Sequence, residues 1–142
     1  MSAQIVSGQT YKITNVKSGN VVDLSGLDNH TIIGYPYHSG KNQQWKFEWV
    51  GDAWTIQSVS SGQYIGTEGS NFANGTQLVS VTSPFKWDIW HDEANQNAFR
   101  FYIHDTRFNW DSSDYGDTTP GRHIILWTNW SGVHQTWTVD AP

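Results

Sequence analysis

The chain has 142 residues, which is enough for one domain with a sizeable core and too few for two. Only 15% of the residues are charged and the net charge is −5 with 8 Lys plus Arg, which argues against nucleic acid and an anionic membrane surface as partners. The absence of cysteine excludes disulfides and thiolate chemistry.

The N-terminal segment MSAQIVSGQTYK carries neither the basic start nor the apolar run of a secretory signal peptide. No apolar stretch approaches the ~18 residues that cross a bilayer. We therefore expect a cytoplasmic protein, with unconventional export left open. In that compartment the three sequons at Asn29, Asn74 and Asn129 would carry no glycan.

An internal repeat begins at Tyr11. The segment YKITNVKSGNVVDLSG (11–26) aligns without a gap with WTIQSVSSGQYIGTEG (54–69), at an offset of 43 residues, and both carry a Ser-Gly turn. A weaker third copy, FRFYIHDTRFNWDSS (99–113), keeps the aromatics Phe99 and Phe101 but lacks that turn. The chain therefore consists of three related units.

Each unit ends in a short run in which apolar and polar residues alternate around a tryptophan: residues 42–49, 85–90 and 134–140. The same period of two recurs elsewhere in the units, and Gly, Pro and Asn turns separate the runs. This pattern predicts half-buried β-strands. No ten residues show helical periodicity, so we expect a single helical turn at most.

Three similar β units, at about 8–50, 51–93 and 94–142, fill the chain without linkers and form a single domain, 1–142. Closing them around a threefold axis buries one face of each and removes most strand edges. We therefore predict an all-β fold, a β-trefoil with pseudo-threefold symmetry. A three-bladed propeller and a β-sandwich with accidental similarity are the alternatives.

Two units end in Gln-x-Trp, at Gln43-Gln44-Trp45 and Gln135-Thr136-Trp137. Each motif follows an aspartate and an aromatic residue at similar distances. On these residues the whole chain resembles the ricin-B-type β-trefoil lectins, and its cysteine-free build is similar to the mushroom members. The resemblance implies a carbohydrate-binding protein with no enzymatic activity and no cofactor, with a role in fungal defence.

In that family, a carboxylate accepts hydrogen bonds from sugar hydroxyls, an aromatic ring stacks on the sugar, an amide bonds a further hydroxyl, and the Gln supports the carboxylate. Carried onto the first unit, these roles fall on Asp23, Tyr35, Asn42 and Gln43, with Tyr37 as a substitute for Tyr35 and His38 as a further contact. On the third unit they fall on Asp111, Trp127, His134 and Gln135, with Trp130 as a rival of Trp127.

The third and second units depart from the family pattern to different degrees. In the third unit a histidine, His134, stands where the family has Asn, although a neutral imidazole can still make one hydrogen bond. The second unit has Gly66 in place of the aspartate, Val79 or Val81 in place of the aromatic, and Phe85 in place of the Gln. We therefore expect two sites and a second unit that binds nothing. The three tryptophans Trp45, Trp87 and Trp137 are expected in the core.

Other chemistry is poorly supported. The run Asp111–Asp117 resembles a calcium loop, but its spacing is wrong for an EF-hand and no bidentate Glu follows. The six histidines show no metal-ligand spacing, so we expect no metal. No nucleophile motif or phosphate loop occurs, and the candidate aspartates lie in separate units, too far apart to act as a glycosidase pair.

The leading functional interpretation is a lectin for terminal galactose or N-acetylgalactosamine on glycoproteins or glycolipids, with a homodimer left open. One alternative is a β-trefoil protease inhibitor that acts through surface loops, which would not need the Asp, aromatic and Gln-x-Trp pattern in two units. Another is an adaptor that binds protein through an apolar, Trp-rich surface.

Overall fold

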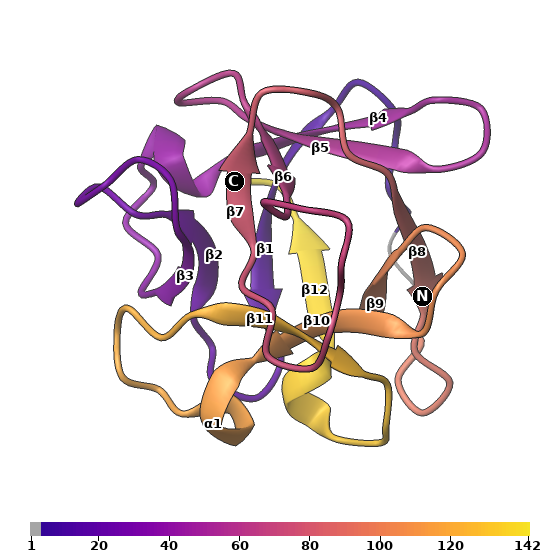
Figure 1. Cartoon of the computed structure of the whole chain (residues 1–142). Helices are drawn as coiled ribbons and strands as arrows, with labels where there is room; N and C mark the ends of the chain where they lie inside the picture. The colour runs from indigo at the N-terminus through magenta and orange to yellow at the C-terminus, as the bar shows by residue number, and fades with distance from the viewer. Residues whose placement is uncertain (1–3) are drawn as a thin grey trace.

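The computed structural model describes residues 4–142, which form an all-β structure of twelve strands in three groups of four (Figure 1). The first group is β1 (Thr10–Asn15), β2 (Val21–Leu24), β3 (Ile32–Tyr35) and β4 (Trp45–Trp49). The second is β5 (Trp54–Ser58), β6 (Tyr64–Gly66), β7 (Val79–Val81) and β8 (Trp87–His91). The third is β9 (Phe99–Ile103), β10 (Phe108–Ser112), β11 (Ile124–Thr128) and β12 (Trp137–Asp140).

Within residues 4–142, helical structure is limited to three short segments. Two are 3₁₀ turns that directly precede the Gln-x-Trp tryptophans, η1 (Lys41–Gln43) and η2 (Val133–Gln135). The third, α1 (Ser113–Gly116), is an irregular turn in which Asp114 and Tyr115 both have φ of 55°. The expectation of one helical turn at most was therefore wrong in number, because two of the turns lie in the loops that carry the Gln-x-Trp glutamines and are too short to show helical periodicity. In Figure 1, α1 lies beside the C-terminal segment that contains η2, with which it is in contact.

The first and last strands of each group form a closed antiparallel barrel. In order around the barrel, β1 pairs with β4, β4 with β5, β5 with β8, β8 with β9, β9 with β12, and β12 with β1. The inner strands of the groups form the hairpins β2–β3, β6–β7 and β10–β11. Isolated bridges join each hairpin to the other two. This arrangement confirms the β-trefoil, and a propeller or an open sandwich would not close such a ring.

The three unit-ending tryptophans anchor the core in equivalent ways. Trp45, Trp87 and Trp137 are at most 1% exposed. Each begins a barrel strand and donates its indole N–H to a backbone oxygen of the hairpin in its own group: Val22 at 3.0 Å, Ile65 at 2.9 Å and Trp110 at 3.3 Å. Burying an indole requires a partner for its N–H, and the same partner position serves in all three groups.

The weaker third copy differs at the turn after its first strand. In the first two groups this turn places a glycine at positive φ, Gly19 at 76° and Gly62 at 77°. In the third group the turn is shorter and Asp105 adopts φ of 62°. Asp tolerates the left-handed region better than most residues, so the turn survives without the Ser-Gly pair.

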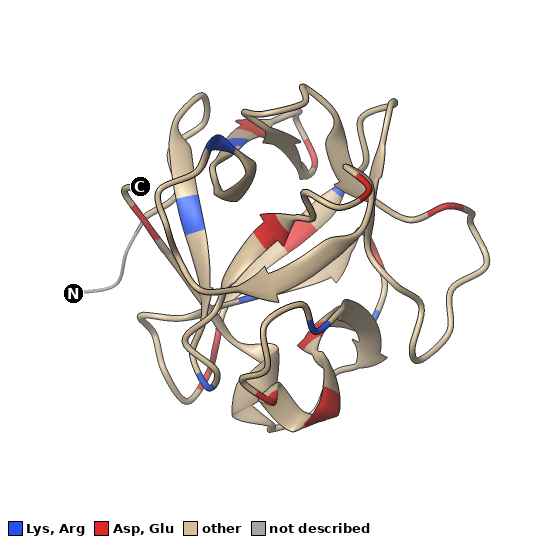
Figure 2. Cartoon of the chain, turned by 90° about the vertical axis from the view of Figure 1, so that its left-hand side faces the viewer, with Lys and Arg blue, Asp and Glu red and all other residues tan. Residues whose placement is uncertain are grey.

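Charged side chains are sparse on this framework. The face in Figure 2 shows Lys and Arg at isolated points of the ribbon rather than in a cluster. Over residues 4–142, no helix has the length and apolar character of a bilayer-spanning segment.

Candidate functional site

The first-repeat site is built around the Asp23 carboxylate on β2, which is 3% exposed. Each of its oxygens accepts one hydrogen bond, Oδ2 from Gln43 Nε2 at 2.9 Å and Oδ1 from Asn42 Nδ2 at 3.2 Å. Both donors lie in η1, directly before the buried Trp45. This one short turn therefore presents both amides that hold the carboxylate.

Gln43 also holds the loop that follows β3. Its Nε2 donates to the Pro36 carbonyl at 2.9 Å, and its Oε1 accepts from the His38 backbone N–H at 2.9 Å. At Gly40 the loop approaches so closely that a Cβ would overlap the His38 ring and the Asn42 side chain. The fully buried Gln43 side chain thus fixes the carboxylate and the adjacent loop together.

Tyr35 supplies the exposed ring of this site. It ends β3, is 40% exposed and meets the His38 ring edge-on at 6.2 Å between centroids. The Tyr37 ring instead lies under Lys12 Nζ, 4.5 Å from the ring centroid. Because Lys12 covers the Tyr37 ring while the Tyr35 ring is exposed, the geometry favours Tyr35 as the stacking ring of this candidate site.

Burial changes the proton affinity of Asp23. Desolvation raises the pKa of this carboxyl, and the hydrogen bond from Gln43, the charge of His38 and the bond from Asn42 partly offset that rise. The amides therefore help to keep a buried carboxylate ionised, which is the form that accepts charge-assisted hydrogen bonds.

The third-repeat site has the same plan. Gln135 Nε2 donates to Asp111 Oδ2 at 2.9 Å and to the Thr128 carbonyl at 3.3 Å, and its Oε1 accepts from the Trp130 backbone N–H at 3.0 Å. The strand register places Asp111 opposite Ile125, as Asp23 is opposite Ile33. Each Gln thus links an aspartate to a strand end and to a loop residue, and Trp130 occupies the position of His38.

His134 takes the place of Asn42. Its Nε2 lies 3.2 Å from Asp111 Oδ2, and its side chain is 5% exposed. Burial lowers the pKa of His134, an effect that Asp111 partly offsets, and burial raises the pKa of Asp111, an effect that Gln135 and His134 partly offset. The neutral imidazole is therefore favoured at this position.

Three exposed aromatic rings surround the third-repeat site. Trp127 on β11 is 39% exposed, Trp130 is 46% exposed and Tyr115 of α1 is 70% exposed. The rings of Tyr115 and Trp130 lie 5.6 Å and 5.2 Å from the His134 ring. These residues line a hollow of about 590 Å³ that also includes Asp111. Both Trp127 and its rival Trp130 therefore line the same hollow as Asp111, and so does Tyr115, which sequence reasoning missed.

The equivalent position in the second repeat is filled. The register places Gly66 opposite Val79, and a Cβ on Gly66 would lie 2.7 Å from Val81 and 2.9 Å from Phe85. Phe85 packs on Trp87 with ring centroids 5.0 Å apart. An aspartate at residue 66 would therefore clash with apolar side chains, so this unit lacks the carboxylate of the other two; that it binds nothing stays a prediction.

The acidic run after β10 is engaged within the protein. Arg122 Nη1 lies 2.6 Å from Asp114 Oδ2, and Arg122 Nε lies 3.2 Å from Asp117 Oδ1. Over residues 4–142, one cluster has the ligand spacing of a metal site: Asp88, His104 and Asp105. There His104 Nδ1 lies 2.7 Å from Asp88 Oδ1, and this hydrogen bond raises the pKa of His104.

Comparisons with known proteins give consistent matches. The family model described as "Ricin-type beta-trefoil lectin domain-like" matches residues 4–81 and 41–127. The structure of the Macrolepiota procera ricin B-like lectin in complex with lactose is 64% identical, with a TM-score of 0.96, and covers 99% of this chain and 100% of that chain. The Rhizoctonia solani agglutinin is 28% identical, with a TM-score of 0.87 and coverage of 99% and 100%.

A more distant match shows the fold alone. The C-half of the earthworm R-type lectin in complex with GalNAc is 19% identical, with a TM-score of 0.71 and coverage of 94% of this chain and 99% of that chain. Curated protein sequences give no significant match.

Proposed function

The chain belongs to the ricin-type β-trefoil lectin family, and from this premise we propose that it binds glycans that end in galactose or N-acetylgalactosamine. One observation carries the proposal: two buried carboxylates, Asp23 and Asp111, are each held by a glutamine beside an exposed ring. The 64% identical lectin bound to lactose supports galactose as the terminal sugar.

The proposed recognition follows from the chemistry of a sugar ring. Galactose has a rim of hydroxyls and one face of C–H groups. The Asp23 carboxylate accepts hydrogen bonds from two hydroxyls, the Asn42 amide bonds a further hydroxyl, and the Tyr35 ring covers the apolar face. In the third repeat the same roles fall on Asp111, His134 and Trp127. Binding and release require no covalent step, so the protein acts as a lectin and not as an enzyme.

The sites are shallow, so we expect dissociation constants of roughly 10⁻³ to 10⁻⁵ M for each. Two sites on one chain would raise the avidity for clustered glycans on glycoproteins or glycolipids. A homodimer would raise it further, and sedimentation velocity would test for one. Cytoplasmic residence stays a prediction, which cell fractionation would test.

The proposal is tested by changing each aspartate to asparagine, which keeps the shape and removes the charge. A glycan array identifies the best galactose-terminated ligand, and calorimetry then measures stoichiometry for the wild type, Asp23→Asn, Asp111→Asn and the double variant. We expect two sites, one site, one site and none, respectively. Asp140→Asn is the matched control, because Asp140 is exposed at the end of β12 and lies outside both sites.

Two outcomes would contradict the proposal. If the folded wild type binds no glycan, the lectin function is wrong, and assays for protease inhibition become the next step. If Asp23→Asn alone abolishes all binding, the third-repeat site with His134 is inactive.

A further inference from the structure

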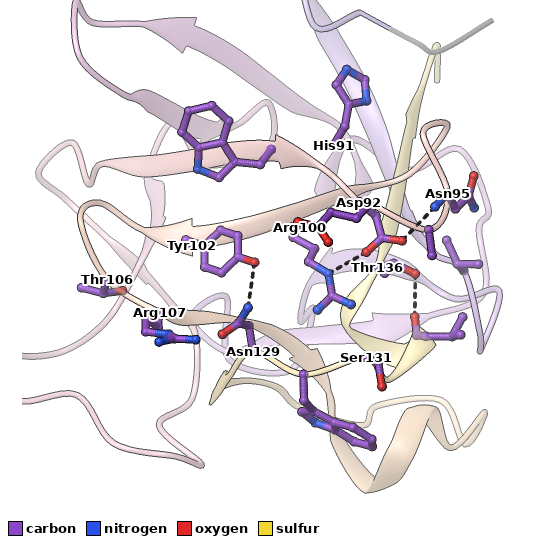
Figure 3. Close-up of a pocket in the computed structure, with 16 residues that line it drawn as sticks. His91, Asp92, Asn95, Arg100, Tyr102, Thr106, Arg107, Asn129, Ser131 and Thr136 are labelled. Atoms are coloured by element: carbon purple, nitrogen blue, oxygen red, sulfur yellow. Dashed lines mark hydrogen bonds and ion pairs between the residues drawn. The ribbon is translucent and has the colours of Figure 1, made fainter.

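A second hollow of about 710 Å³ lies beside the third-repeat site (Figure 3). It is bounded by the hairpin β8–β9, the turn before β10 and the loop after β11. Its lining includes Asn129 and Trp130, which also line the hollow around Asp111. The two hollows are therefore adjacent, on either side of these two residues. The size of the second hollow lies within the ~300–1,000 Å³ of small-molecule sites.

The floor of the second hollow is the outward face of β8–β9. Phe99, Phe101 and Ile103 point into the core, so Arg100 and Tyr102 point outward. Across the hairpin, Trp90 is paired with Arg100 and is 65% exposed. This face presents two aromatic side chains and a guanidinium to the hollow.

The fold itself does not require aromatic residues on this face. In the register of the three barrel hairpins, the position of Trp90 is occupied by Glu48 in β4 and by Asp140 in β12. The position of Tyr102 is occupied by Gln57 and Thr14. A large exposed apolar ring that the equivalent hairpins replace with a carboxylate indicates a binding surface rather than a packing requirement.

The polar groups of the hollow are firmly positioned. Arg100 Nε donates to Asp92 Oδ1 at 2.8 Å, and Arg100 Nη1 donates to Gln135 Oε1 at 3.0 Å. Because Gln135 also holds Asp111, one hydrogen-bond chain connects the floor of the second hollow to the third-repeat carboxylate. Figure 3 shows Tyr102 and Asn129 pointing toward each other, and Asn129 Nδ2 donates to the Tyr102 hydroxyl at 3.4 Å.

The charges of the hollow favour a neutral ligand. Arg100 is paired with Asp92, and the two remaining charged residues, Arg107 and Glu93, are of opposite sign. The groups that remain to contact a ligand are aromatic faces, hydroxyls and amides, which are the partners of a neutral sugar ring.

We propose that the third-repeat site extends into this second hollow and binds neutral, galactose-terminated oligosaccharides of at least three sugar units. The terminal galactose lies at Asp111, the chain passes Trp130, and an inner sugar stacks on Trp90. This inference rests on the proposed third-repeat site. In the first repeat, Lys12 is equivalent to Arg100 and Tyr37 is equivalent to Asn129. Lys12 lies over the Tyr37 ring there, so the contact fills the place of the second hollow and the first repeat has no such extension.

The test isolates the third-repeat site with Asp23→Asn and compares lactose with a galactose-terminated neutral tetrasaccharide by calorimetry. We expect the tetrasaccharide to bind roughly three- to tenfold more tightly than lactose. Adding Trp90→Ala should remove this gain and leave lactose affinity unchanged. Trp49→Ala is the matched control, since Trp49 is 49% exposed at the end of β4, outside the hollow, and should keep the gain.

A second readout is the indole N–H resonance of Trp90, assigned by its loss in Trp90→Ala. It should shift with the tetrasaccharide and stay in place with lactose. Equal affinities for the two sugars, or a gain that survives Trp90→Ala, would overturn the extension while leaving the lectin function intact. If the Asp23→Asn variant binds neither sugar, the third repeat is not a sugar-binding site, and the proposed extension is overturned as well.

Discussion

The aspartates of the two sites have conflicting requirements. Asp23 must be ionised to accept two charge-assisted hydrogen bonds, yet it is 3% exposed, and burial disfavours the charge. The amides of Gln43 and Asn42 reduce this conflict without removing it, because the pKa of Asp23 remains above its ordinary value of 3.8. The site therefore holds its acceptor in a state that is less stable than a solvated carboxylate.

This conflict predicts opposite pH responses of binding and stability. Lactose affinity at the first repeat, isolated with Asp111→Asn, should fall on acidification at a higher pH than for an aspartate of ordinary pKa. Stability moves the other way, because a group whose pKa is raised by folding binds its proton more tightly in the folded state. The contribution of Asp23 to the free energy of unfolding therefore rises as the pH falls through its folded pKa.

The measurement is calorimetry with lactose between pH 7 and pH 4, together with urea unfolding over the same range. The additional change Asp23→Asn removes the titrating group, so the difference in unfolding free energy between the two variants isolates its contribution. If the contribution of Asp23 to the free energy of unfolding falls on acidification, as lactose affinity does, then the pKa of Asp23 is not raised by folding.

At the scale of elements, one loop distinguishes the two sites. The register leaves eleven residues, 113–123, between β10 and β11 and seven, 25–31, between β2 and β3. The longer loop carries α1 and places Tyr115 beside His134. It can lie this close because Gly116, at φ of 76°, has no side chain: a Cβ there would be 2.9 Å from His134 Cβ and 3.1 Å from Lys17 Cδ.

Gly116→Ala should therefore weaken the third-repeat site and leave the first unchanged. Strain at positive φ and the contact with His134 should lower the free energy of unfolding by about 1–3 kcal/mol. Lactose titrations in the Asp23→Asn and Asp111→Asn backgrounds report the two sites separately. Gly121→Ala is the control, since Gly121 has φ of 92° in the same loop but open space around its Cβ position. Equal loss of third-site affinity in both variants would refute the role of the contact.

The features of the fold that recur in all three units could be predicted from the sequence. Period-two alternation and the three tryptophans identified the strands and the core, and the substitution at Gly66 with Phe85 indicated the closed second position. Tyr115 was missed because its place depends on two consecutive non-glycine residues at positive φ, which residue spacing does not encode. The hollow at Trp90 was missed because residues 90–107 and 129–136 meet only after the barrel closes.

At the scale of the whole molecule, the first and last strands of the chain pair, so we expect the chain to unfold as one cooperative unit. Ile13 of β1 is opposite Val139 of β12, so the barrel closes only when the last strand is in place. Each repeat contributes one indole hydrogen bond to this closed core, including the second repeat, where no candidate site was predicted. The Trp87 indole is therefore expected to matter for stability and not for sugar binding at the other two repeats.

Trp87→Phe tests this separation. Trp87 is fully buried, and its indole N–H bonds the Ile65 carbonyl at 2.9 Å, so the change leaves a cavity and an unsatisfied carbonyl. We expect urea unfolding to show a loss of about 2–4 kcal/mol, whereas the exposed Trp90→Ala should cost less than about 0.5 kcal/mol. Lactose affinity at the first repeat should stay within twofold of the wild type under conditions where the variant is folded, because Gln43 holds Asp23 within the first repeat whereas Trp87 bonds the hairpin of the second. A larger loss of affinity would mean that the core transmits strain between repeats, and that the site-free second repeat contributes to sugar binding as well as to stability.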